Sequence, residues 1–181
     1  MAATETLTEK IDHLLALFNA RKMDLPDGLF DRKTQFVLNG APFETLLGQP
    51  PADPLVLMLT RGPAGYRFIT KSLQHAVPDG TVERGDVTTT GDPFSASLKL
   101  WLSGHLRGTG EAIETVVDIT LHVAPTGPVD VAHATVDEVP LDRLRTYEVR
   151  AAMDLLFDTG SVLELRRDFG PGMITALARV E

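Results

Sequence analysis

Three titratable residues in the second half of the chain, Asp137, His133 and His105, are candidates for proton transfer. Acid or base catalysis needs a titratable side chain that is partly shielded from water, so that its pKa approaches the working pH. Asp137 follows a predicted strand, where a carboxylate can reach the mouth of a pocket. His133 has the same strand parity and is expected on the same side of the sheet. These three are the candidate catalytic residues.

Each candidate also has a purely structural interpretation. Asp137 precedes a predicted helix, and residues 135–138 fit a capping box. His133 can be a buried histidine whose ring nitrogens are satisfied, and His105 can be an exposed turn residue. Four strand residues span about 13 Å, so Asp137 and His133 are expected to contact different parts of one ligand.

The composition excludes several classes of protein. The chain has 181 residues, a formal net charge of −8 and no basic cluster, which disfavours a nucleic-acid surface and an anionic membrane surface. The absence of cysteine excludes disulfides, thiol nucleophiles and thiolate zinc sites. No two histidines have metal-ligand spacing, and we expect neither a metal nor a cofactor. With no signal peptide visible, a cytoplasmic protein is expected.

The hydrophobic pattern predicts helices first and strands afterwards. Residues 5–21 and a segment beginning at Gly62-Pro63 have apolar residues at helical spacing. The buried face of the second helix is marked by Tyr66, Ile69, Leu73 and Ala76. The period then changes to two, which predicts strands over residues 81–90, 94–104, 111–123 and 129–136. This order is typical of an α+β fold with an antiparallel sheet.

Several short motifs resemble, in order and spacing, those of the SnoaL-type polyketide cyclases, over about residues 7–145. The motifs are Gly62-Pro63-Ala64-Gly65, Ala76-Val77-Pro78-Asp79, Asp86-Val87, Gly91-Asp92 and the segments 103–108 and 131–137. The resemblance implies a nuclear-transport-factor-2-like cone, in which a curved antiparallel sheet packs on N-terminal helices and leaves an apolar pocket. It also implies a homodimer through the outer sheet face, where Trp101 is an aromatic anchor.

The same resemblance implies roles for the candidate residues. The family closes a ring by an intramolecular aldol step, with an aspartate as acid and base, and this aspartate falls on Asp137. The turn histidine falls on His105, and the tryptophan and glutamate fall on His133 and Val131, where this chain departs from the pattern. The resemblance thus implies a domain that binds a small apolar molecule and acts as an aldol cyclase or isomerase.

A second resemblance covers residues 146–181. The segments Tyr147-Glu148-Val149-Arg150, Leu163-Glu164-Leu165, 156–161 and 175–180 are similar to the start of a crotonase-like carboxyltransferase half-domain of biotin-dependent acyl-CoA carboxylases. We therefore expect a SnoaL-like domain, residues 1–145, followed by an incomplete carboxyltransferase-like segment of one helix and two strands. The glycine-rich loops that hold the acyl-CoA oxyanion in that family are absent, so carboxyl transfer is not expected.

Two alternatives to a ligand-binding enzyme remain at this point. The domain can be a non-catalytic binding or assembly domain of a larger acyl-CoA carboxylase-like protein, of which this chain is a fragment. It can also be a structural remnant whose pocket is filled by large side chains. An open apolar pocket argues against the last of these interpretations.

Overall fold

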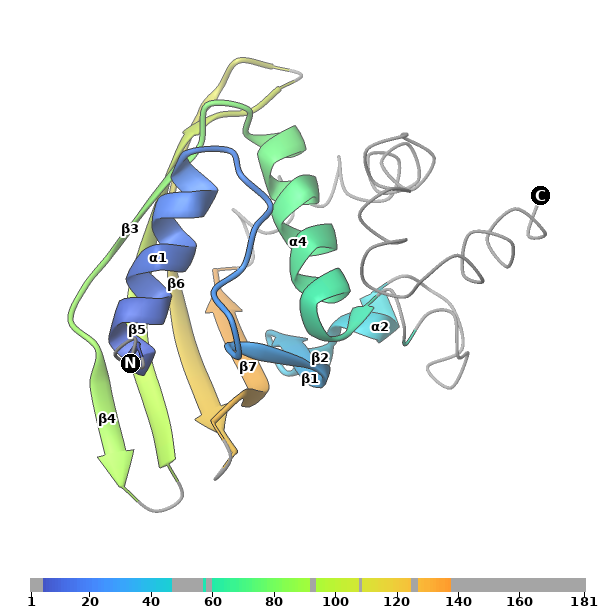
Figure 1. Ribbon diagram of the computed structural model, residues 1–181. Helices are drawn as coiled ribbons and strands as arrows, with labels where there is room; N and C mark the ends of the chain where they lie inside the picture. Colours follow the sequence, from blue (N-terminus) through green and yellow to red (C-terminus); the bar gives the residue numbers. More distant parts are fainter. Residues whose placement is uncertain are drawn as a thin grey trace.

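The computed structural model describes residues 5–46, 57, 60–91, 94–107, 109–124 and 127–137. The first half contains α1 (Leu7–Asn19), β1 (Phe30–Leu38), β2 (Ala41–Pro42), α2 (Phe43–Leu46) and α4 (Gly62–Ala76). The second half contains β3 (Thr81–Arg84), β4 (Thr88–Gly91), β5 (Phe94–His105), β6 (Ala112–Val123) and β7 (Val129–Val136). The α+β order expected from the sequence is confirmed (Figure 1). The predicted C-terminal helix and two strands lie outside the described residues.

The described strands form one curved sheet in the order β2-β1-β7-β6-β5-β3, with β4 paired to β5. All of its pairs are antiparallel except β1 and β7, which run parallel. The sheet is therefore mixed, whereas the sequence predicted an antiparallel one. Hairpin turns fix the antiparallel pairs between neighbours in sequence. No hairpin fixes the direction of β1 against β7, since most of the described chain lies between them.

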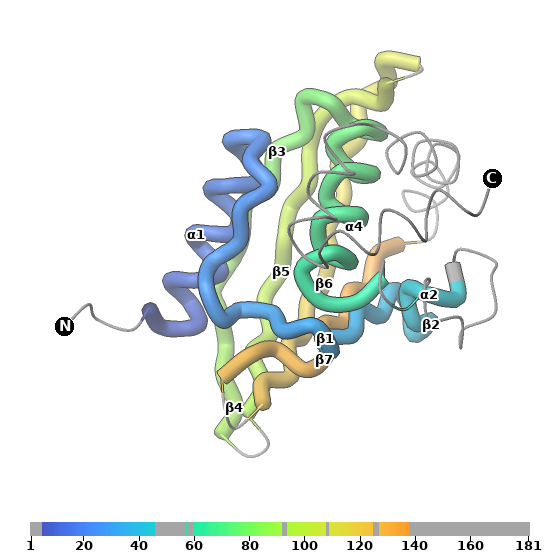
Figure 2. Tube along the Cα trace, turned by 45° about the vertical axis from the view of Figure 1, so that its right-hand side comes forward, coloured from blue at the N-terminus to red at the C-terminus, as the bar shows by residue number. Residues whose placement is uncertain are grey.

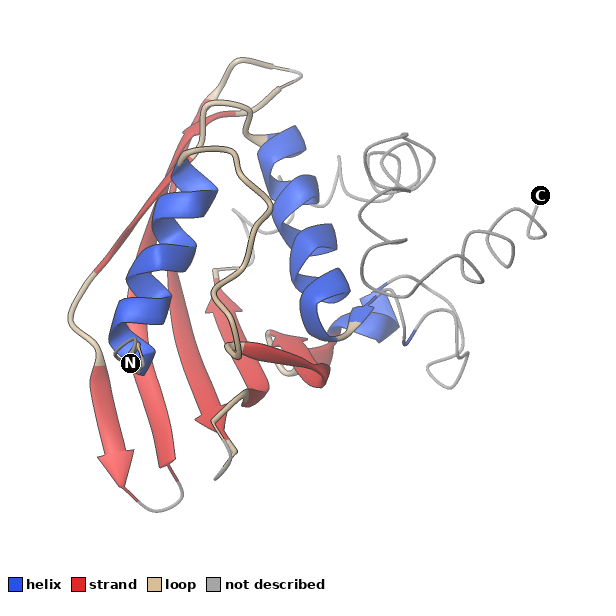
Figure 3. Cartoon of the chain, viewed as in Figure 1, coloured by secondary structure: helices blue, strands red, loops and turns tan. Residues whose placement is uncertain are grey.

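α1 and α4 lie on the same side of the curved sheet, which we call its inner face (Figures 1 and 2). Figure 3 separates this helical layer from the strands behind it. Alternate residues of β5 and β6 point to the inner face and are buried, among them Ala96, Leu98, Leu102, Ile113 and Leu121. Within the described residues, no helix is both long and apolar enough to cross a membrane.

α1 begins at a capping box and buries one face. The Thr6 hydroxyl accepts a hydrogen bond from the Glu9 N–H, while the Glu9 carboxylate accepts one from the Thr6 N–H at 2.7 Å. Ile11 and Phe18, two residues of the predicted apolar stripe, are only 4% and 5% exposed. The cap fixes where the helix starts, and the stripe fixes which side meets the sheet.

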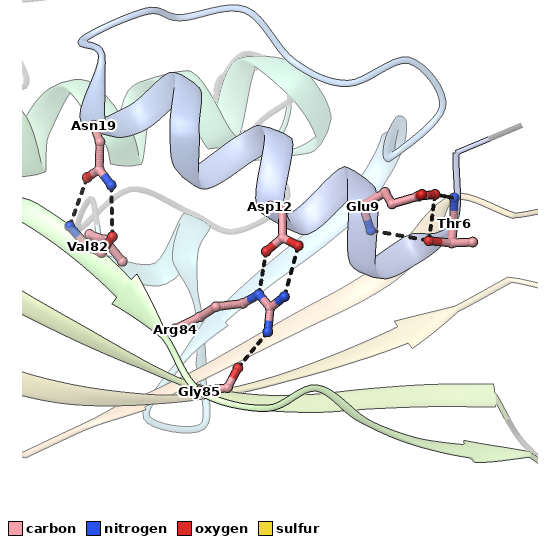
Figure 4. A network of polar contacts seen from close by, with 7 residues as sticks. All are labelled: Thr6, Glu9, Asp12, Asn19, Val82, Arg84 and Gly85. Carbon is pink, nitrogen blue, oxygen red and sulfur yellow. Dashed lines mark hydrogen bonds and ion pairs between the residues drawn. The ribbon is translucent and has the colours of Figure 1, made fainter. Parts of the chain in front are cut away.

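Two polar contacts hold α1 on β3 (Figure 4). The Asn19 side chain accepts a hydrogen bond from the Val82 N–H and donates one to the Val82 carbonyl, both at 2.9 Å. Closer to the start of the helix, Arg84 donates two hydrogen bonds to Asp12, which hold the pKa of that carboxyl below its usual range. The amide of Asn19 thus pairs with a strand backbone as a neighbouring strand would.

α4 is fixed at both ends. Gly62 has φ +58°, and a Cβ there would lie 2.4 Å from the Asp31 carbonyl oxygen, so a residue without a side chain lets the helix start directly against β1. At the other end, Arg107 donates its backbone N–H to the Ala76 carbonyl at 2.9 Å and its Nε–H to the His75 carbonyl at 2.7 Å. These bonds satisfy carbonyls that the last turn leaves free.

The sequence prediction of one strand over residues 81–90 was wrong, because β3 and β4 are separated at residues 85–87. A Cβ on Gly85 would lie 3.0 Å from the Trp101 ring, and the Gly85 N–H bonds the Lys99 carbonyl. The large indole on the neighbouring strand therefore occupies the place that a side chain at position 85 would need. The alternation of residue types along one strand does not predict a contact with a side chain of the neighbouring strand.

We predict that Asn19→Ala lowers the free energy of unfolding by about 1–3 kcal/mol, because two hydrogen bonds are lost and the Val82 backbone groups are left unpaired. Urea unfolding followed by circular dichroism measures this change. Lys22→Ala, an exposed neighbour just beyond α1, is the control and should change stability by less than about 0.5 kcal/mol. Equal effects of the two substitutions would contradict the role of the Asn19 side chain in holding α1 on β3.

Candidate functional site

A cavity of about 330 Å³ lies between the helices and the inner face of the sheet. α1 contributes Ile11, Leu14, Leu15 and Phe18 to its wall. The predicted buried face of α4, namely Tyr66, Ile69, Leu73 and Ala76, also lines this cavity. The volume falls in the range of small-molecule sites, which is roughly 300–1,000 Å³. The pocket is therefore open rather than filled by side chains.

The wall of the cavity is almost entirely apolar. Among its described residues there is no Lys, Arg, Asp or Glu, and the side chains with a polar group are those of Tyr66, Thr70, Ser72, Thr115 and His133. Burial of a charged group without a partner is costly, whereas burial of an apolar surface is favourable. The cavity therefore suits a molecule that is apolar over most of its surface.

Aromatic rings form two groups in the cavity wall. The Phe30 ring packs edge-on against Phe36 with centroids 5.4 Å apart, and it lies tilted on Tyr66 at 5.5 Å. A second pair, Phe43 and Phe68, has centroids 5.7 Å apart. All five rings line the cavity. Such surfaces favour stacking or edge-on contact with a flat ring.

Two hydroxyl groups in the wall lack a hydrogen-bond partner. Ser72 on α4 and Thr115 on β6 are 8% and 5% exposed, and their hydroxyl oxygens are buried without a partner. Each such group costs about 1–3 kcal/mol. The sequence prediction missed both. Thr115 could have been found, because it interrupts an alternating series of apolar residues that point to the inner face.

His133 and Asp137 do not lie together on the cavity. His133 belongs to the wall, but its ring packs edge-on against His122, with centroids 5.3 Å apart. It pairs with Thr120, on the side of the sheet opposite to Ala132 and Ala134. Asp137 follows β7, is exposed, and is not among the described residues that line the cavity. Its acid/base role stays a prediction, and the helix that it was expected to cap lies outside the described residues.

His105 lies outside the cavity, in a polar pair with Asp79. The Asp79 carboxylate accepts hydrogen bonds from the His105 backbone N–H and from its ring Nδ1, both at 2.7 Å. The ring hydrogen bond, followed by the backbone one, lowers the pKa of Asp79. A Cβ on Gly104 would lie 2.5 Å from Val77, so the strand approaches this turn closely. The pair joins the end of β5 to the turn after α4.

The described residues contain no group of three or more His, Asp or Glu side chains placed to hold a metal ion. One carboxylate, that of Glu44 on α2, is buried outside the cavity wall. Glu44 is 3% exposed and accepts a hydrogen bond from Arg61 at 3.0 Å. This ion pair links α2 to the start of α4, where α4 meets β1. It has a structural position beside the cavity rather than a place in its wall.

No protein-family model matches this chain, and no curated protein matches it. Several solved structures are similar to it. A SnoaL-like polyketide cyclase from Agrobacterium tumefaciens has a TM-score of 0.54 and 16% identity, over 77% of this chain and 98% of that one. IdmH from Streptomyces antibioticus, described as a candidate polyketide cyclase, has a TM-score of 0.55 and 18% identity, over 78% and 99%.

An NTF2-like protein of unknown function from an Exiguobacterium species has a TM-score of 0.50 and 17% identity, over 71% of this chain and 98% of that one. At these identities the likeness shows the fold. The chain therefore has the SnoaL-like, NTF2-like α+β cone fold that its sequence predicted. The predicted division at residue 145 and the carboxyltransferase-like tail remain predictions, since residues 138–181 lie outside the described part.

We predict that the Asp79–His105 pair makes the free energy of unfolding depend on pH. The folded-state pKa of Asp79 lies below that of the unfolded chain, so its contribution is present above about pH 4 and is lost as pH falls through the lowered value. Asp79→Asn should therefore be less stable than the wild type at pH 6, and the difference should shrink towards pH 2.5. Urea midpoints across this range test it, and a constant difference would contradict it.

Proposed function

We propose that this domain binds a small apolar molecule in the cavity between α1, α4 and the sheet. The observation that carries the proposal is an open cavity of about 330 Å³ whose described wall holds no charged Lys, Arg, Asp or Glu side chain. Water in such a space forms few hydrogen bonds, so an apolar molecule that displaces it gains free energy. The aromatic rings in the wall favour a ligand with a flat ring system.

We further propose an aldol-type cyclisation or an isomerisation as the reaction, with Asp137 as acid and base. The resemblance of residues 131–137 and the descriptions of the SnoaL-like neighbours support it. Because Asp137 is exposed, proton transfer requires its carboxylate to turn towards the ligand. Binding is thus the part of the function that the geometry supports best. The assembly-domain alternative depends on residues 146–181, outside the described part.

The binding proposal predicts that Ala134→Phe abolishes the binding of an apolar dye. Ala134 lines the cavity from β7, so a phenyl ring at this position occupies part of the space that a ligand needs. Fluorescence titration with the neutral dye N-phenyl-1-naphthylamine should show at least a tenfold weaker affinity, equal to about 1.4 kcal/mol.

Thr135→Phe is the matched control, because the neighbouring residue is exposed and lies on the other side of the strand. This variant should bind the dye as the wild type does, and so should Asp137→Asn. Circular dichroism confirms that each variant is folded. Equal dye affinity of the wild type and Ala134→Phe would show that the dye does not enter this cavity.

We also propose that two copies of the chain pair through the face of the sheet opposite the helices, the outer face. Trp101 and Val116 are cross-strand partners there, and each is 39% exposed. Beside them, Lys99 and Asp118 form an ion pair at 2.8 Å. An exposed tryptophan next to an apolar neighbour, with polar groups around it, is the composition of an interface centre.

The dimer proposal predicts that Trp101→Asp makes the protein monomeric, because an interface centre does not tolerate an unpaired buried charge. Sedimentation equilibrium measures the mass of each variant. Phe94→Asp is the control, since Phe94 is 43% exposed but begins β5 with the opposite parity. A wild type that sediments as a monomer at micromolar concentration would refute the proposal.

A further inference from the structure

We infer that Tyr66 selects the ligand of this cavity by donating a hydrogen bond from its phenol hydroxyl to an uncharged oxygen of an otherwise apolar molecule. This inference rests on the proposed binding function and adds the chemical class of the ligand. It would assign a specificity role to a residue of α4 that none of the sequence motifs singled out.

Elimination among the polar groups of the described wall leads to Tyr66. The hydroxyl oxygens of Ser72 and Thr115 are buried beneath the surface of the wall. The ring of His133 packs against His122, on the outer face. Thr70 is only 3% exposed and hydrogen-bonds the Tyr66 phenol. The phenol of Tyr66 is the remaining polar group in a wall position.

The surroundings of Tyr66 hold its ring in a fixed orientation. Thr70 lies one helical turn further along α4, so the two side chains are neighbours on one face. The Phe30 ring covers the Tyr66 ring with centroids 5.5 Å apart and planes inclined at 32°. When the Thr70 hydroxyl donates to the phenol oxygen, the phenol hydrogen stays available to a ligand, and the two bonds strengthen each other.

The charge of the cavity wall and of the Tyr66 phenol decides which kind of ligand oxygen can bind there. Burial raises the pKa of Tyr66, so the phenol stays protonated and acts as a donor at neutral pH. The described wall offers no Lys or Arg to pair with a carboxylate. A ketone, ester or ether oxygen can accept the phenol hydrogen without bringing a charge into the cavity, whereas a carboxylate would lose its hydration without compensation.

The test uses two flat apolar probes that differ in one oxygen, fluorene and 9-fluorenone. Their affinities for the wild type and for Tyr66→Phe are measured by displacement of N-phenyl-1-naphthylamine. The wild type should bind 9-fluorenone about two- to tenfold more tightly than fluorene, the ratio expected for one neutral hydrogen bond. Tyr66→Phe should bring this ratio to one, because the ring is kept while the hydrogen-bond donor is lost, and the affinity for fluorene is the internal reference for each variant.

Two further measurements separate a specific hydrogen bond from a general effect on packing. Thr70→Val removes the partner of the phenol at almost constant volume, and it should reduce the ratio of the 9-fluorenone affinity to the fluorene affinity. Fluorene-9-carboxylate should bind the wild type more weakly than 9-fluorenone. A carboxylate that binds as tightly as the ketone would overturn the inference about an uncharged oxygen.

The outcomes distinguish this inference from the binding proposal. If fluorene binds the wild type and is excluded by Ala134→Phe, the cavity is a binding site. If the ratio of 9-fluorenone to fluorene affinity is then the same in the wild type and Tyr66→Phe, Tyr66 is not the selecting residue. If neither probe nor the dye binds the wild type, the binding proposal itself fails.

Discussion

The cavity depends on one constraint, which is that polar and backbone contacts hold α1 and α4 on the curved sheet near their ends. Asn19 ties the end of α1 to β3, and Gly62 lets α4 start against β1. At the other end of α4, Arg107 binds the last carbonyls of the helix. With their ends held in these places, the helices leave a cavity of about 330 Å³ between themselves and the inner face. Apolar residues of the inner face, such as Leu98 and Leu121, therefore belong both to the packed core and to the cavity wall.

An open apolar cavity has a cost in stability. Residues of the wall forgo dispersion contacts that a closed core would give them, and two wall hydroxyls lack a hydrogen-bond partner. Contacts at the margins offset part of this cost. Asn39 repeats on β7 what Asn19 does on β3, since its side chain bonds both the N–H and the carbonyl of Val136 at 2.9 Å. Two asparagine side chains thus replace strand partners at separate places in the sheet.

Local pattern predicted the elements well, and long-range contacts explain the rest. The spacing of Tyr66, Ile69, Leu73 and Ala76 identified the face of α4 that lines the cavity, because helical periodicity is a local property. The break between β3 and β4 was missed; it lies at Gly85, which packs against the Trp101 ring of another strand. The parallel direction of β1 was missed for a similar reason, as its partner is separated from it by most of the described chain.

The candidate site was predicted less well than the fold. Parity grouped His133 with Val129, but an irregularity of the β6–β7 register places Val129 in the inner core and His133 on the other side. Parity alone also does not say which face of a strand is the inner one. The ring contact with His122 places His133 on the outer face. Motifs also drew attention to His105, which pairs with Asp79 at a turn. The cavity is built mainly from apolar and aromatic residues. A search for titratable or metal-binding residues in a sequence does not find them.

An apolar cavity and a catalytic carboxylate place opposite demands on the same structure. An acid/base needs partial desolvation to bring its pKa towards neutrality, yet a permanently buried carboxylate would be costly in a wall without cations. Asp137, the acid/base that we propose, lies at the end of β7, one residue beyond Val136, which the Asn39 side chain fixes in the cavity wall. If strand alternation continues past Val136, the Asp137 carboxylate lies on the outer side. Catalysis would then depend on a turn of the backbone at that residue, whereas ligand binding would not.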